Sequence, residues 1–223
     1  MRLLLIRHGQ TPSNVVGALD TGRPGPGLTA LGQTQAEAIP GALAEEAIDA
    51  IYASPLVRTQ LTAAPLAAAR GLDAEVLEGF EEIAAGRWEM RNDMEAVRAY
   101  METASRWAVG DLDAMIEGGE SGHEFFARYD NAIAKVAAAN PAATAVVVSH
   151  GAAIRVWAAA RIAGVDLSEA AKWRIYNTGM CALDGDPQNG WELVRWVREP
   201  LGGIELEDAR ALDVDPPMLR SGR

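Results

Sequence analysis

The sequence is short of cysteine, of long apolar runs and of positive charge. Its 223 residues include one cysteine, Cys181, so no disulfide can form within the chain, and a reducing compartment is the simplest expectation. No apolar run approaches the about 20 residues that a membrane-spanning helix needs, and the first residues lack the charged and then apolar pattern of a secretory leader. These absences predict a cytoplasmic protein with no membrane partner.

Acidic residues outnumber basic ones. Lys and Arg total 20 against 31 Asp and Glu, which gives a formal net charge of −11, and only Lys135 and Lys172 are lysines. Because nucleic acids and anionic membranes need a basic face, this balance argues against both as partners. A small anionic ligand stays open, since a pocket can be locally basic. The three histidines and one cysteine show no spacing typical of metal ligands, so we expect neither a metal site nor a cofactor.

Two apolar runs that end in His-Gly organise the rest of the chain. Residues 3–6 are an uninterrupted apolar run followed by Arg7 and His8, and the stretch AVVVSHG places His150 at the end of a second run. Such runs predict strands buried on both faces, as in a parallel sheet. Ligands of open α/β sheets bind just past the carboxyl ends of the strands. We therefore expect Arg7, His8 and His150 to meet at one site.

Strands alternate with helices along most of the chain. The strands are expected at residues 3–6, 48–53, 73–77, 144–149, 173–184 and 191–197, and the helices at residues 30–43, 56–70, 92–108, 122–139 and 152–163. This alternation predicts a three-layer α/β/α fold with a mainly parallel central sheet, formed by one domain over residues 1–200. Residues 92–121 depart from the alternation and are expected to form a small helical cap over the site. Residues 201–223 turn polar and contain proline, which predicts a loosely packed tail.

Cap and turn residues predict some of the boundaries. Thr29 is expected to cap the helix that follows it, and Ser54 with Pro55 to begin the next helix. Pro65 should kink or divide that helix. Residues 12–27 are rich in glycine and proline, which predicts irregular backbone.

Further motifs accompany the two His-Gly strand ends. The chain contains RHGQT at 7–11, SPLVRTQLTA at 54–63, FEEIAAGRWE at 80–89, GGES at 118–121, VSHG at 148–151 and NTG at 177–179. With these motifs, nearly the whole chain from Met1 to about Val197 resembles the histidine phosphatase superfamily, the phosphoglycerate mutase-like clan. The resemblance implies phosphoryl transfer through a phosphohistidine without a metal ion, on a small phosphorylated substrate.

The resemblance implies that His8 is the nucleophile and that a glutamate is the general acid. To attack phosphorus, one imidazole nitrogen must be unprotonated while the proton on the other is held by an acceptor, which in the family is a backbone carbonyl. The residues alone leave Glu81 and Glu82 open, because adjacent side chains of an extended segment face opposite ways. The family's acid stands four residues before the glycine of its G-x-W-E element, which is Gly86 here. The resemblance therefore selects Glu82.

The resemblance also implies a phosphate clamp. Arg7, Arg58 and His150 would hold the equatorial oxygens of the phosphoryl group, where fixed donors stabilise its charge. Asn14 would add an amide donor, and Gly151 a backbone N–H at a helix N-terminus.

Two departures from the family pattern concern the rim of the site. Met90 stands where the family often has a glycine after W-E, and Ala84 and Ala85 replace the acidic or aromatic pair that often precedes Gly86. Both bear on substrate identity more than on chemistry.

Hydrolysis is the favoured activity, with two alternatives. A mutase would share the first half-reaction, but the family's cofactor-dependent mutases carry a longer insertion between the acid and the second histidine than the segment from Glu82 to His150. A non-catalytic phosphate-binding adaptor would have lost the nucleophile or the acid, and His8 and Glu82 are both present. A homodimer is compatible with the sequence, which leaves the oligomeric state open.

Overall fold

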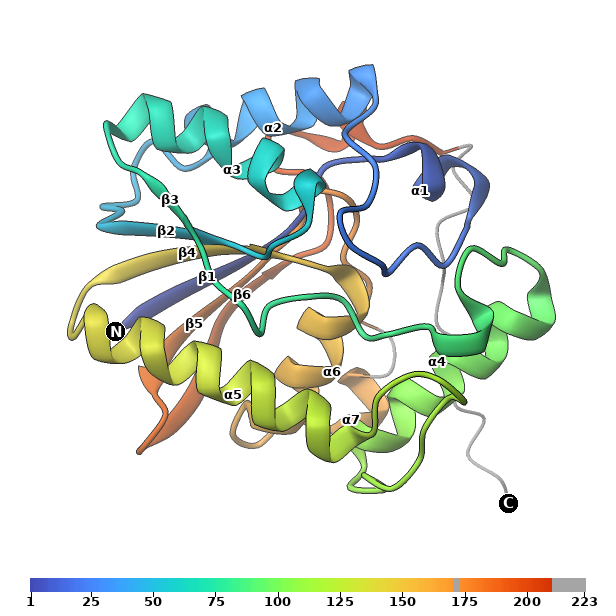
Figure 1. The fold of residues 1–223 in the computed structure, drawn as a ribbon. Helices are drawn as coiled ribbons and strands as arrows, with labels where there is room; N and C mark the ends of the chain where they lie inside the picture. Colours follow the sequence, from blue (N-terminus) through green and yellow to red (C-terminus); the bar gives the residue numbers. More distant parts are fainter. Residues whose placement is uncertain (171–172, 210–223) are drawn as a thin grey trace.

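A mixed six-stranded sheet forms the centre of the molecule, and helices cover both of its faces (Figure 1). The computed structural model describes residues 1–170 and 173–209. The strand order is β3-β2-β4-β1-β5-β6. The strands are β1 (Arg2–Arg7), β2 (Ala50–Ala53), β3 (Ala74–Val76), β4 (Thr144–Ser149), β5 (Met180–Asp186) and β6 (Gly190–Val197).

The direction of the strands changes on one side of β1. Strands β3, β2, β4 and β1 are parallel to one another, whereas β5 runs antiparallel to β1 and β6 antiparallel to β5. The predicted three-layer α/β fold is confirmed. The expectation of a mainly parallel sheet holds for β1 to β4, and the final hairpin makes the sheet mixed.

Strand β1 is buried on both faces, as its uninterrupted apolar run predicted. Leu3 and Leu5 belong to one hydrophobic cluster, Leu4 and Ile6 to the other, and all four side chains are fully buried. In the parallel ladder between β1 and β4, Arg7 lies opposite Ser149. The residue that follows each strand end is a histidine, so the register brings His8 and His150 side by side.

Each face of the sheet has its own helices (Figure 1). Helices α2 (Ala30–Ala42) and α3 (Val57–Arg70) cover one face. Helices α5 (Gly122–Ala139) and α6 (Gly151–Arg161) cover the other, and α4 (Met94–Ala108) packs against α6. The short helical elements are α1 (Pro12–Val16), η1 (Gly86–Trp88), α7 (Leu167–Ala170) and η2 (Ile204–Leu206).

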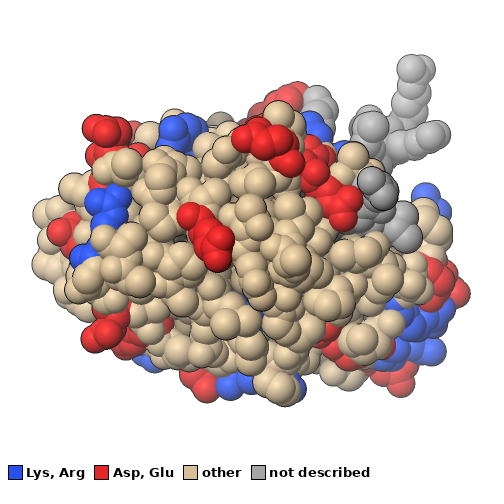
Figure 2. Space-filling model, turned by 90° about the horizontal axis from the view of Figure 1, so that it is seen from above, with Lys and Arg blue, Asp and Glu red and all other residues tan. Residues whose placement is uncertain are grey.

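The outer face of the α2–α3 layer carries few charged side chains (Figure 2). Within these two helices the charged residues are Glu37, Arg58 and Arg70, and Arg58 is buried. This face therefore shows no concentration of positive charge. Among the helices of residues 1–170 and 173–209, none has both the length and the apolar character needed to cross a membrane.

Two predicted boundaries differ from the structure, and one is confirmed. Residues 12–27 were expected to be irregular, which holds for residues 17–27, whereas residues 12–16 form α1 behind a local capping box of Thr11 and Asn14. Strand β5 begins at Met180 and not at residue 173, because backbone groups before it bond elsewhere: the Thr178 N–H donates to the Arg7 carbonyl over 3.0 Å. Thr29 caps α2 as predicted, accepting from the Gly32 N–H.

Helix α3 differs from its prediction at two points. It begins at Val57 with Leu56 at the N-cap position, later than predicted, although the Leu56 N–H donates to Ser54 Oγ over 3.4 Å. Pro65 was expected to kink or divide the helix, and the helix is continuous there, so it is not divided. Ala63 and Leu66, on either side of the proline, are both buried.

The first part of the predicted tail contacts the domain. Leu201 is buried, the Gln35 side chain donates to the Leu206 carbonyl over 2.8 Å, and the Gln10 side chain donates to Asp208 over 2.9 Å. The rest of that prediction, for residues 210–223, lies outside the described residues.

Candidate active site

A pocket at the carboxyl ends of β1 and β4 collects the predicted site residues. Six of the seven line it, and these are Arg7, His8, Asn14, Arg58, Glu82 and Gly151. The seventh, His150, lies behind His8, with the ring centroids 5.3 Å apart. Residues from strand ends, loops and three helices thus meet in one place.

His8 has the hydrogen bond that the nucleophile role requires. Its Nδ1 lies 2.8 Å from the Gly9 carbonyl oxygen, which can only accept, so Nδ1 carries the proton and Nε2 has a free lone pair. Gly9 is needed there because a Cβ would lie 2.7 Å from the Gly32 carbonyl oxygen of α2. Burial, and then the charges of Arg58 and Arg7, lower the pKa of His8 well below its ordinary value. The imidazole is therefore neutral at neutral pH.

His150 is fully buried and held by Ser54. The Nε2 atom of His150 lies 2.8 Å from Ser54 Oγ, whereas its Nδ1 has no hydrogen-bond partner among the described residues. Burial, followed by Arg58 and His8, lowers the pKa of His150 well below its ordinary value, so this ring is neutral too. A buried nitrogen without a partner is costly unless a ligand meets it.

Arg58 presents a similar unsatisfied donor. Its Nη2 donates to the Asp20 carbonyl over 2.9 Å, and its Nη1 lies 3.9 Å from the Asp20 carboxylate, with no hydrogen-bond partner in the described part of the chain. The guanidinium packs against Gly25, where a Cβ would lie 2.5 Å from Nη1. Burial lowers the pKa of Arg58, while the nearby carboxylates of Asp20 and Glu82 act in the opposite direction and raise it. A buried arginine at a pocket is suited to bind an anion bidentately.

Arg7 reaches the pocket beneath the start of α6. Its Nη1 donates to the Ile175 carbonyl over 2.8 Å. A Cβ at Gly151 would lie 3.1 Å from Arg7 Nε, so the glycine makes room for the guanidinium beside the helix N-terminus. The strand end and the helix start therefore contribute positive charge to the same wall of the pocket.

The amide of Asn14 is oriented by three donors. Its Oδ1 accepts from the Thr11 N–H over 3.0 Å, from the Thr11 hydroxyl over 3.1 Å and from the Asn177 side chain over 3.2 Å. Because Oδ1 is engaged, the NH₂ group of Asn14 remains as the donor toward the pocket. The side chain of Asn177 also donates to the His8 carbonyl over 3.0 Å, which ties this donor to the nucleophile.

Of the two adjacent glutamates, Glu82 lines the pocket. Its carboxylate accepts from the backbone N–H groups of Ala152 over 3.1 Å and Ala153 over 2.9 Å, at the start of α6. The carboxylate of Glu81 instead accepts from the Gly79 N–H over 2.7 Å and pairs with Arg23. The two side chains point apart, as an extended segment requires.

Sequence reasoning missed four residues at this site. Ser54 was interpreted as a helix cap, and its serine-proline context contains nothing that points to a histidine 96 positions away. Asp20 received no role because it lies in a segment predicted to be irregular. Tyr100 and Met101 of α4 also line the pocket, and the predicted cap over residues 92–121 was the signal for their position.

The described residues include no group of three or more His, Cys, Asp and Glu side chains placed to hold a metal ion. The donors gathered at the pocket are instead arginine, imidazole, amide and backbone N–H groups, which suit an oxyanion.

Known sequences resemble this chain over most of its length. Residues 3–199 match the family described as the histidine phosphatase superfamily, branch 1. A PE-PGRS family protein from Mycobacterium tuberculosis is 36% identical over an alignment of 224 residues that covers 94% of this chain, and the chain spans 38% of that relative's length. Phosphoserine phosphatase 1 from Hydrogenobacter thermophilus is 34% identical over 169 residues, covering 76% of this chain and 79% of that protein. Adenosylcobalamin/alpha-ribazole phosphatase from Escherichia coli is 33% identical over 150 residues, covering 67% of this chain and 73% of that protein.

Solved structures agree. A mycobacterial glucosyl-3-phosphoglycerate phosphatase in complex with VO3 superposes with a TM-score of 0.74 at 28% identity, over 89% of this chain and 99% of that one. The alpha-ribazole phosphatase of Shigella flexneri superposes with a TM-score of 0.70 at 28% identity, over 93% of this chain and 100% of that one. With the family match spanning both histidine strand ends, the acid segment and the final hairpin, the chain belongs to the histidine phosphatase superfamily.

Proposed function

We propose that this protein hydrolyses small phosphomonoesters through a covalent phosphohistidine at His8, without a metal ion. The observation that carries the proposal is the 2.8 Å hydrogen bond between His8 Nδ1 and the Gly9 carbonyl, in a pocket where the buried Arg58 Nη1 has no hydrogen-bond partner among the described residues. That bond leaves Nε2 as a neutral nucleophile. Relatives named as phosphatases of small phosphorylated molecules support the same reaction.

In the first half-reaction the phosphoryl group moves from the substrate to His8. The Nε2 lone pair attacks phosphorus, and the bond from phosphorus to the ester oxygen breaks. The departing ester oxygen takes a proton from the Glu82 carboxyl group, and the product leaves as the free alcohol. Arg58, with Arg7 and the Nδ1–H of His150, stabilises the negative charge on the equatorial oxygens.

In the second half-reaction water releases the phosphate. The Glu82 carboxylate takes a proton from water, whose oxygen attacks phosphorus while the bond from phosphorus to Nε2 breaks. Inorganic phosphate leaves, His8 returns to its neutral form, and Glu82 is protonated for the next cycle. One carboxyl group at the pocket serves both steps.

A panel of phosphomonoesters assayed with the purified protein tests the proposal. We expect hydrolysis that persists in excess EDTA and is abolished in His8→Ala. His123→Ala is the matched control, because its side chain is 63% exposed and pairs with Asp113. Loss of activity with EDTA, or full activity of His8→Ala, would contradict the proposed mechanism.

A further inference from the structure

The segment that carries Glu82 is held by side chains and not by a sheet. It lies outside the strands and helices, yet every backbone carbonyl from residue 79 to residue 83 accepts a side-chain hydrogen bond. The donors are Arg128 to the carbonyls of Gly79, Glu81 and Glu82, Ser149 to that of Phe80, and Tyr100 to that of Ile83. An irregular segment gains a fixed path in this way.

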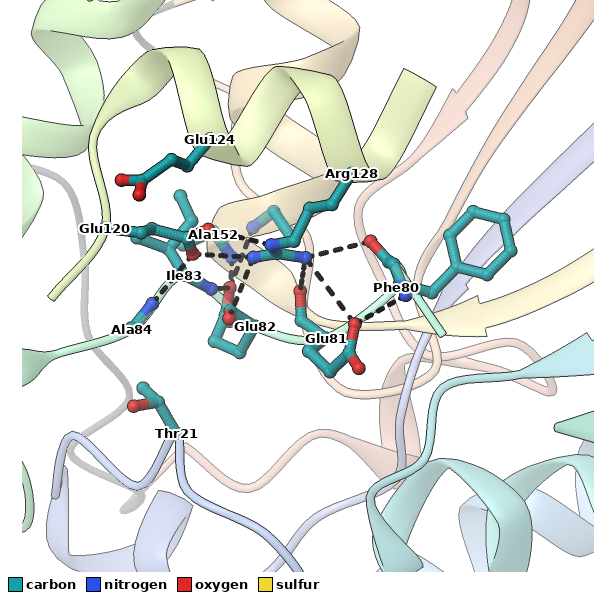
Figure 3. Close-up of polar contacts among 12 residues, drawn as sticks. Thr21, Phe80, Glu81, Glu82, Ile83, Ala84, Glu120, Glu124, Arg128 and Ala152 are labelled. Carbon is teal, nitrogen blue, oxygen red and sulfur yellow. Dashed lines mark hydrogen bonds and ion pairs between the residues drawn. The ribbon is translucent and has the colours of Figure 1, made fainter. Parts of the chain in front are cut away.

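Arg128, on α5, makes three of these five bonds (Figure 3). Its Nη1 donates to Gly79 over 2.8 Å and to Glu81 over 2.9 Å, and its Nη2 donates to Glu82 over 3.1 Å. The fork of the guanidinium thus spans four residues of the segment. A lysine, with a single ammonium, lacks this fork.

Glu120 fixes Arg128 from the other side and touches the segment itself. Its Oε2 accepts from Arg128 Nε over 2.8 Å and its Oε1 from Nη2 over 2.6 Å, which is a bidentate pair. The same Oε1 accepts from the Ala84 N–H over 3.1 Å (Figure 3). The arginine is therefore held in one orientation while it donates to the segment.

We propose that Arg128 is a positioning residue for Glu82, an inference that rests on the proposed function. The Glu82 backbone is fixed by Arg128, while its carboxylate contacts the first turn of α6 at Ala152 and Ala153. General acid catalysis needs the donor within hydrogen-bond reach of the leaving oxygen. A misplacement of about 1 Å costs on the order of 10²-fold in rate. Loss of Arg128 leaves the acid present but out of place.

The test compares leaving groups, because a structural defect affects all substrates alike. Nitrophenolate leaves without a proton, whereas an alkoxide needs one. The ratio of kcat/KM for an alkyl phosphate to kcat/KM for p-nitrophenyl phosphate therefore reports proton donation in the phosphorylation step. We expect Arg128→Met to lower this ratio by about 10-fold or more, in the same direction as Glu82→Gln.

Arg161→Met is the matched control. Like Arg128, Arg161 pairs with a carboxylate, that of Asp130, over 2.7 Å. Its guanidinium lies 4.3 Å from the ring of Phe126, as that of Arg128 lies 5.1 Å from the ring of Phe125. The side-chain hydrogen bonds of Arg161 go to Asp130 and not to residues 79–84, so the control should keep the wild-type ratio. Arg128→Lys keeps the charge and loses the fork, and its ratio should fall between those of Arg128→Met and the wild type.

Two results would overturn the inference. An unchanged ratio in Arg128→Met, with both kcat/KM values lowered equally, would reduce Arg128 to a structural residue. The double variant Glu82→Gln with Arg128→Met should show no lower ratio than Glu82→Gln alone, and a further fall would show that Arg128 acts by another route.

If Arg128→Met does not fold, Glu120→Gln gives the same readout with a smaller expected fall. An active His8→Ala would instead reject the proposed function itself.

Discussion

The hydroxyl of Ser54 lies 2.8 Å from Nε2 of His150, in a fully buried pair. The hydroxyl oxygens of Ser54 and Thr59 lie 2.9 Å apart, and either hydroxyl can be the donor. When Thr59 donates in this pair, the Ser54 hydroxyl proton is free to point at the imidazole. If Ser54 donates to Nε2, the ring proton of the neutral His150 stands on Nδ1. The nitrogen without a partner is then a donor ready for an anion.

Ser54→Ala should therefore weaken oxyanion binding without removing any group that touches the anion. Without the hydroxyl, the proton of His150 is no longer held on Nδ1. A hydrogen bond contributes about 1 kcal/mol, which corresponds to about 5-fold in affinity. Vanadate inhibition measures the change, and Ser121→Ala, at the cap of α5 outside the pocket, is the control. Unaltered vanadate inhibition in Ser54→Ala would show that His150 does not depend on Ser54.

The two buried histidines make stability depend on pH in a defined direction. Burial first, and then neighbouring charges, lower the folded-state pKa of both His8 and His150. In the unfolded chain both have a pKa of about 6.5, so below that pH the unfolded state binds protons that the folded state does not. Their contribution to stability is fully present above that value and is lost as the pH falls through it.

Urea denaturation at a series of pH values from about 7.5 to about 5 tests this linkage. We expect the free energy of unfolding to fall with falling pH, and His150→Gln to fall less steeply than the wild type. His123→Gln, at an exposed position, serves as the comparison. A wild-type protein that gains stability on acidification would contradict the assigned neutral state.

Met90 adopts a backbone conformation that favours glycine. Its φ is 62°, its side chain is 60% exposed, and its N–H donates to the Leu19 carbonyl over 2.8 Å. A left-handed conformation costs a non-glycine residue roughly 1–2 kcal/mol, which exceeds the entropy cost of glycine. Met90→Gly should raise the free energy of unfolding by about 1 kcal/mol.

The control for Met90 is Met94, four residues later. It is 82% exposed but begins α4, where glycine is unfavourable, so Met94→Gly should destabilise the protein. Chemical denaturation of both variants gives the comparison. Destabilisation by Met90→Gly would mean that its side chain contributes more than its backbone costs.

Sequence patterns predicted the parts of this molecule that depend on neighbours in the chain. The apolar runs ending in His8 and His150 predicted buried strands, and the register of β1 and β4 then brings the two histidines together without further information. The departure at Met90 was visible in the motif, although its cost depends on the φ angle. The choice of Glu82 came from the family resemblance, whose acid stands four residues before the glycine that is Gly86 here. Gly86 has a φ of 54° and lies against residues 117–119.

The remaining features depend on residues distant in the sequence. Ser54 before Pro55 has the local pattern of a helix cap, and only the fold places His150 within its reach. Arg128 is one arginine on an amphipathic helix until the chain brings residues 79–82 beneath it. Contacts between segments 46 or more residues apart cannot be read from periodicity or from cap residues.

We predict that residues 92–121 influence substrate choice through Met101. Met101 and Tyr100 line the pocket from α4, and the Met101 side chain is buried. Met101→Leu conserves volume but replaces a flexible chain with a branched one, so it changes the shape of the wall at little cost in stability. The order of kcat/KM among alkyl phosphates should change, while p-nitrophenyl phosphate is little affected.

Met94→Leu, on the exposed side of the same helix, is the control for Met101. An order of substrates that is the same in the wild type and in both variants would contradict the assignment of this helix to substrate choice.

The most direct test of the account is to capture the phosphorylated enzyme. Glu82→Gln should slow the release of phosphate by water more than the transfer from p-nitrophenyl phosphate, so the intermediate should accumulate. Mass spectrometry after an alkaline quench measures it. The account predicts one phosphoryl group per chain, on the peptide that contains His8, and none in Glu82→Gln with His8→Ala. Turnover without this adduct, or a phosphoryl group on another residue, would contradict the central claim.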